Sequence, residues 1–190
     1  LMAVAHADAI KAAAEALCLV SNPTQLCVQG QWSGKDGAQG RVQLVKLRPD
    51  RFQALMPENV KIETELNGEI TGAMKPDGAL QGNADLRLAP GNLDLVANGE
   101  PLKVALGGGS VQAKATGKDA NAEVKLSLGD LGQIASTARL SDLTGKPRIV
   151  SKVQAEIKDL AIVSAFAPQV QEVKGRLTAD IDVSGALSKP

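Results

Sequence analysis

Three observations predict an all-β fold built as one long antiparallel meander sheet. Apolar and polar residues alternate with a period of two over residues 60–74 and 173–187, which is the spacing of side chains on the two faces of a strand. Shorter alternating runs fill the chain from Gln25 onward, with Gly, Pro, Asn and Asp between them. Aromatic residues make up 2% of a chain that is 44% hydrophobic, so the apolar face of these strands is formed mainly by Ala, Val, Leu and Ile.

The elements are expected in a simple order along the chain. The Ala-rich residues 7–17 form either a short helix or the lead-in to a strand. Turn sequences such as Lys75-Pro76-Asp77-Gly78 separate nearly all the strands that follow, and evenly spaced strands with tight turns indicate an antiparallel meander. Residues 48–56 and 159–167 are predicted as one or two short helical connectors, each followed by a proline. The predicted strands are residues 25–33, 40–47, 60–74, 79–88, 92–97, 102–106, 111–117, 122–128, 133–140, 149–157 and 173–187.

We expect one elongated unit with two regions, residues 1–57 with a cysteine hairpin and connector, and residues 58–190 with β-repeats. A shift of 113 residues aligns Val60 with Val173 and Gly72 with Gly185. This alignment indicates a degenerate internal repeat, although two alternating strands also align by chance. A strand pattern that runs to the last residue, and an opening without the apolar segment of a signal peptide, favour an excerpt from a longer polypeptide. No run approaches the roughly 20 apolar residues that span a bilayer.

Cys18 and Cys27 flank a Ser-Asn-Pro-Thr turn between two short apolar runs. A hairpin at this turn would bring the two sulfurs together, and a disulfide would imply an oxidising compartment. The alternative is a pair of unrelated buried thiols. Their spacing fits neither a zinc site nor a CxxC redox pair.

Composition excludes several classes of function. Lys plus Arg equals Asp plus Glu at 21 each, so the chain lacks the positive charge that drives nucleic-acid binding. The single histidine, His6, has no Cys or Ser partner close in sequence, and the carboxylates at Glu63, Glu65 and Glu69 alternate with basic residues on the polar face. Gly107-Gly108-Gly109 lacks the Lys of a phosphate loop. We therefore expect no enzymatic activity, no metal and no cofactor.

The destination of the apolar face decides the functional prediction. An outer-membrane barrel normally carries aromatic girdles, which a chain with one Trp and no Tyr does not supply. The remaining choices are a β-sandwich core and a curved open sheet that holds lipid tails. The candidate lipid-facing residues are Val60, Ile62, Leu66, Ile70, Met74, Leu80, Leu86, Val124, Leu126, Val153, Ile157, Val173, Leu177, Ile181, Val183 and Leu187.

Three blocks together resemble the TamB family of the translocation and assembly module, a relative of the AsmA-like proteins. The first is the cysteine hairpin followed by Trp32. The second is the connector Phe52-Gln53-Ala54-Leu55-Met56-Pro57, which leads into the strand with Gly68 and Gly72. The third is the strand over residues 173–187, followed by Lys189-Pro190. The resemblance covers about half of the chain and suggests an internal or C-terminal-half fragment.

The resemblance implies a curved sheet of β-taco form with a hydrophobic groove. It also implies a periplasmic location in a protein anchored in the inner membrane, a TamA-like outer-membrane barrel as partner, and a role in phospholipid transport and outer-membrane biogenesis. Independent physical reasoning favours lipid, because exposing a 16-carbon tail to water at about 0.8 kcal/mol per methylene costs about 13 kcal/mol. The alternative is a chaperone-like scaffold that receives unfolded outer-membrane proteins or autotransporters by β-augmentation.

Overall fold

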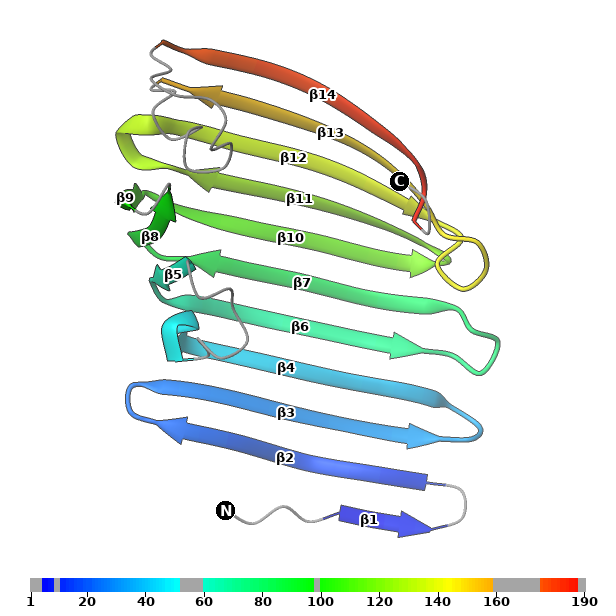
Figure 1. Cartoon of the computed structure of the whole chain (residues 1–190). Coiled ribbons are helices and arrows are strands. Elements are labelled where there is room, and N and C mark those ends of the chain that lie inside the picture. Colours follow the sequence, from blue (N-terminus) through cyan, green and yellow to red (C-terminus); the bar gives the residue numbers. More distant parts are fainter. Residues whose placement is uncertain (1–4, 9–10, 52–59, 98–99, 159–174, 188–190) are drawn as a thin grey trace.

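The computed structural model describes residues 5–8, 11–51, 60–97, 100–158 and 175–187. Within these residues the chain is almost entirely β-structure (Figure 1), with one short 3-10 helix, η2 (Gly129–Leu131). The strands are β1 (Ala5–Asp8), β2 (Lys11–Ser21), β3 (Thr24–Ser33), β4 (Gly37–Leu47), β5 (Val60–Glu63), β6 (Leu66–Met74), β7 (Leu80–Leu88), β8 (Gly91–Ala97), β9 (Glu100–Leu106), β10 (Gly108–Gly117), β11 (Asp119–Ser127), β12 (Gly132–Ser141), β13 (Arg148–Ile157) and β14 (Leu177–Ala186).

Eleven strands form one antiparallel sheet in the order β1-β2-β3-β4-β6-β7-β10-β11-β12-β13-β14. Strands β1 and β14 are its two edges and lie far apart, so the sheet is a curved, open layer (Figure 1). Most neighbours in the sheet are also neighbours in the chain and are joined by tight turns. The structure therefore confirms the predicted all-β fold with an open, groove-like antiparallel meander.

Strands β5, β8 and β9 leave the meander and form a separate three-stranded sheet. The prediction of a single strand over residues 60–74 was therefore wrong, because the chain changes sheets at Thr64 and Glu65. The Thr64 hydroxyl donates to the Ala89 carbonyl oxygen (2.6 Å) and the Ala89 N–H donates to the Glu65 carbonyl oxygen (2.8 Å). Alternation continues through the break, so the sequence pattern alone does not reveal it.

The ends of the predicted elements differ in three places. The Ala-rich segment forms β1 and the start of β2, so the strand alternative holds over the helix. Strand β14 begins at Leu177, and residues 173–174 lie outside the described residues. Residues 49–51 form a single 3-10 turn, while the rest of that connector and the connector at residues 159–167 also lie outside them.

The hydrophobic core sits where the small sheet covers one margin of the large one. Val104 of β9 is fully buried, and Leu106, Leu128 and Ile157 are buried with it. Burial of one such side chain stabilises the fold by about 1.5–3 kcal/mol. The partly buried side chains packed on this core are Ile62, Leu88, Leu93, Leu102, Leu126, Leu131 and Ile134.

Residues that are 113 positions apart in sequence lie in the same transverse row of the large sheet. Following the partner register from β6 to β14, Ile70 shares its row with Val183, and Gly72 shares the next row with Gly185. Here a transverse row means one residue per strand, each directly opposite the next. The register is consistent with the repeat interpretation of the sequence.

Candidate functional site

One face of the large sheet is apolar along almost its whole length. Directly opposite residues of paired strands point to the same face, so the register identifies which side chains line up. The central transverse row crosses ten strands and is apolar except at one serine: Leu19, Leu26, Leu44, Gly68, Leu86, Val111, Val124, Ser136, Val153 and Ile181. We call this side the apolar face.

Four glycines stand directly opposite one another on the apolar face. Gly30, Gly40, Gly72 and Gly82 form one transverse row across β3, β4, β6 and β7. Larger side chains flank this row, including Ile70 on one side and Met74 and Leu80 on the other. A depression of about 560 Å³ lies over Gly40, Gly72 and Gly82 and is lined by these same three side chains.

The structure brings most of the predicted lipid-facing residues together. Leu126 and Ile157 lie at the margin covered by the small sheet, where the core is packed. The other members are partly or largely exposed. The predicted residues that share the apolar face are Leu66, Ile70, Met74, Leu80, Leu86, Val124, Leu126, Val153, Ile157, Leu177, Ile181 and Val183.

Four predicted residues do not lie on this face of the large sheet. Val60 and Ile62 belong to β5 of the small sheet, and Ile62 packs on the core, because the chain changes sheets after Glu63. Val173 lies outside the described residues. Leu187 follows the last residue of β14 and its N–H donates to the Pro147 carbonyl oxygen.

Sequence reasoning missed the part of the face that comes from β2 and β3. Leu17, Leu19, Val28 and Trp32 are all exposed and share the apolar face. Alternation within residues 25–33 was a sufficient signal for Val28, since a strand was predicted there. The irregular pairing between Ala14 and Leu17 disrupts the period of two in β2 and obscured the other two leucines.

The opposite face of the large sheet is polar and crossed by surface ion pairs. Examples are Arg41 with Glu69 (3.4 Å) and Lys125 with Glu123 (2.7 Å). A depression of about 680 Å³ on this face is lined by glutamine, asparagine, threonine and arginine side chains. It offers no apolar wall, so the apolar face is the better candidate for a lipid.

The predicted disulfide is present and also lies on the polar face. Cys18 and Cys27 are directly opposite partners in the β2–β3 hairpin and their sulfurs are bonded. In the same transverse row the next residue is Gln43. The bond therefore fixes the hairpin from the polar side and leaves the apolar side uncovered.

Two ion pairs near the small sheet shift pKa values without forming an acid and base pair. The Arg48 guanidinium donates two hydrogen bonds to Asp50 (2.7 and 3.1 Å) and lowers the pKa of that carboxyl. The Lys61 ammonium likewise lowers the pKa of Glu63 through a hydrogen bond. All four groups are mostly solvent-accessible, and their role is structural.

Two further searches covered only the described residues. They contain no helix that is both long and apolar enough to cross a membrane. They also contain no group of three or more His, Cys, Asp or Glu side chains placed to hold a metal ion.

Comparison with known protein families decides the relationship. Residues 4–190 match the family model described as "TamB, N-terminal domain". The chain belongs to the TamB family. No match was found among curated proteins or among solved structures. The matched TamB model describes the N-terminal domain, in place of the C-terminal half that the sequence resemblance suggested. Membership gives the chain a TamB-type role in the translocation and assembly module.

Proposed function

We propose that this chain is a non-enzymatic, periplasmic part of an inner-membrane-anchored TamB-type protein, and that its apolar face carries phospholipid acyl chains toward the outer membrane. The observation that supports this most is the continuity of the apolar face. Its central row crosses ten strands, which at about 4.8 Å per strand extends for roughly 43 Å. That length exceeds the roughly 30 Å of hydrocarbon in a bilayer.

The exposure of this face supports a ligand rather than a packed core. Ile70 is 39% exposed, Trp32 is 49% exposed and Ile181 is 51% exposed. Large contiguous apolar patches on a soluble surface usually mark binding sites. The small sheet covers only the margin near Leu88 and Leu126, which leaves the rest of the face available to acyl chains.

Photo-crosslinking from paired positions tests the proposal. A photoreactive residue at Ile70 or Ile181 points to the apolar face, whereas one at the neighbouring Thr71 or Asp182 points to the polar face. We expect phospholipid adducts from the first pair in cell envelopes and none from the second. Equal labelling from both pairs, or polypeptide adducts alone from the first pair, would sink the proposal. Ile62, which packs on the core, is the dry control.

A chaperone-like scaffold for outer-membrane proteins and autotransporters, acting with a TamA-like barrel, is the second candidate. Strand β14 supports it, because this ten-residue strand is an edge of the large sheet and presents a row of backbone donors and acceptors. In the same crosslinking experiment this function predicts polypeptide adducts from β14 that depend on newly made outer-membrane protein. Absence of such adducts would rule it out.

A further inference from the structure

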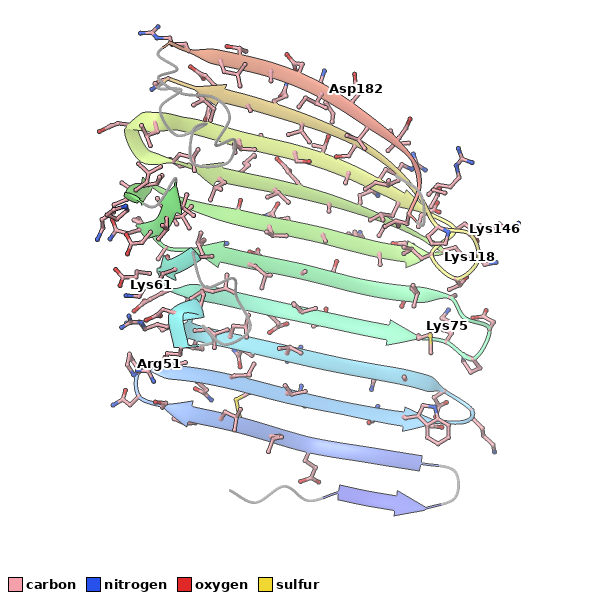
Figure 2. The ribbon with its side chains drawn as sticks, viewed as in Figure 1. Arg51, Lys61, Lys75, Lys118, Lys146 and Asp182 are labelled. Carbon is pink, nitrogen blue, oxygen red and sulfur yellow. A yellow bond between two sulfur atoms is a disulfide. The ribbon has the colours of Figure 1, made fainter. Side chains whose placement is uncertain are left out.

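The turns along one long edge of the large sheet share an unusual composition. Five turns lie at this edge, between β1 and β2, β3 and β4, β6 and β7, β10 and β11, and β12 and β13. Each carries one lysine and one aspartate within or beside it. The pairs are Asp8 with Lys11, Lys35 with Asp36, Lys75 with Asp77, Lys118 with Asp119, and Asp142 with Lys146. Figure 2 shows Lys75, Lys118 and Lys146 along this edge.

The opposite edge differs in both composition and covering. Its described tight turns, at residues 22–23, 89–90, 107 and 128–131, contain no lysine. The small sheet packs beside this edge and buries Val104 and Leu106 there. Arg51 and Lys61, which lie on this side in Figure 2, belong to the connector and to the small sheet.

The lysines and aspartates of the first edge are not neutralised by each other. Lys35, Lys75, Lys118 and Lys146 are exposed, and among the described residues none of them forms an ion pair. Turn hydrogen bonds engage one carboxylate oxygen of each of three aspartates: Asp36 accepts from the Ser33 hydroxyl (3.1 Å), Asp77 from the Ala79 N–H (2.9 Å) and Asp142 from the Lys146 N–H (2.9 Å). Asp119 lies 4.0 Å from Arg139.

The apolar face begins directly inside this edge. Trp32, Ala38, Met74 and Leu80 form its outermost row there, and Met74 is 47% exposed. From Met74 to Leu66, near the covered margin, β6 extends for about 27 Å at 3.4 Å per residue. The tails of one leaflet fill about half of a 30 Å hydrocarbon layer, or roughly 15 Å. A tail laid along the strands therefore fits between the open edge and the small sheet.

We propose that these Lys–Asp turns form a headgroup-binding edge for a zwitterionic phospholipid that bears a phosphate and a primary ammonium. The lysines hold the phosphate, the aspartates face the ammonium, and the tails lie on the apolar face. A net anionic headgroup would meet as many carboxylates as ammonium groups, so charge complementarity favours the zwitterion. Neighbouring turns stand two strands, or about 9.6 Å, apart, so successive turns form a series of equivalent sites. The inference rests on the proposed acyl-chain function.

The single tryptophan provides the measurement, because Trp32 lies on the apolar face beside this edge. The whole chain is titrated with nitroxide-labelled phosphatidylethanolamine, phosphatidylglycerol and diacylglycerol of identical tails, and quenching of Trp32 gives three Kd values. One variant is K35Q/K75Q/K118Q/K146Q and a second is D36N/D77N/D119N/D142N, whose amide oxygens keep the turn acceptors. The control K103Q/K114Q/K125Q/K152Q removes the same charge elsewhere, and circular dichroism checks that all variants fold.

The lysine variant is expected to bind both phospholipids about tenfold more weakly, a loss of about 1.4 kcal/mol, with diacylglycerol unchanged. The aspartate variant is expected to weaken phosphatidylethanolamine only, and the control to change none of the three. Equal weakening of all three lipids by the lysine variant, no change in its phospholipid affinity, or an equal effect of the control would overturn the headgroup edge while leaving the acyl-chain function standing. Equal effects of the aspartate variant on both phospholipids would overturn the zwitterionic assignment. If the parent chain binds none of the three, the proposed function fails and the headgroup edge fails with it.

Discussion

Gly40 of β4 lies directly opposite Gly72 of β6 on the apolar face. Neither residue has a side chain, so the middle of the apolar face is hollow there and the depression of about 560 Å³ lies above it. The two glycines differ from Gly82, their neighbour in the same row, in what a larger residue would meet. A Cβ at Gly72 would have no atom within 4 Å, whereas one at Gly82 would lie 2.8 Å from the Thr71 carbonyl oxygen.

Gly72→Val is therefore expected to fill the depression without unfolding the sheet. A β-branched residue is also favoured over glycine within a strand, so the thermal midpoint should stay equal or rise. Displacing about two methylene contacts of a bound tail costs about 1.6 kcal/mol, or roughly a tenfold weaker affinity. Calorimetry and Trp32 quenching measure the two effects. Gly82→Val is the matched control and should lower the thermal midpoint; unchanged lipid affinity in Gly72→Val would argue against occupancy at this place.

Aspartate at Ile70 and at Val104 should have opposite consequences. Ile70 is 39% exposed on the apolar face and Val104 is fully buried. A carboxylate at Ile70 stays hydrated, so Ile70→Asp should fold with a small loss of stability and should abolish lipid quenching. Val104→Asp buries a charge without a partner and should prevent folding. Urea unfolding separates the two, and an unfolded Ile70→Asp would indicate that the apolar face is packed rather than open.

The sequence predicted the meander well because alternation and turn residues are local signals. It correctly placed the lipid-facing side of β6, β7, β11, β13 and β14. It failed at Thr64, where the chain changes sheets while its alternation continues, because a change of pairing partner leaves no mark on a period of two. It also failed to anticipate the glycine row, since Gly30, Gly40, Gly72 and Gly82 become neighbours only through the register of four strands.

Thr64→Val tests the change of sheets between β5 and β6. Thr64 is buried, and its hydroxyl is a hydrogen-bond donor to the Ala89 carbonyl oxygen (2.6 Å). Valine has the same shape but leaves that carbonyl without its donor, which costs about 1–3 kcal/mol. Thr64→Ser keeps the hydroxyl and should lose less stability. Equal losses in urea unfolding for the two variants would show that the methyl group, and not the hydrogen bond, stabilises this junction.

Acidification should weaken the connector through Asp50. The Arg48 hydrogen bonds hold the pKa of Asp50 below its usual value of 3.8, so the folded state binds this proton less readily than the unfolded state. The pair therefore contributes stability above that value and loses it as the pH falls through the lowered pKa. Asp50→Asn should be slightly less stable than the parent at pH 7 and should lose less on going to pH 3. Urea midpoints at both pH values measure this, and equal losses in the two proteins would contradict it.

Removal of the disulfide should destabilise the β2–β3 hairpin specifically. Cys18 and Cys27 are nine residues apart, and closing so short a loop stabilises the folded state by about 2–3 kcal/mol, chiefly by restricting the unfolded chain. Cys18→Ala/Cys27→Ala should lower the urea midpoint, and a reductant should lower that of the parent equally. Backbone amides of β2 and β3 should exchange hydrogen faster, while those of β11 and β12 keep their protection, because the bond lies far along the sheet from them. A reductant that still destabilises the double variant would mean that its effect on the parent does not come from this bond.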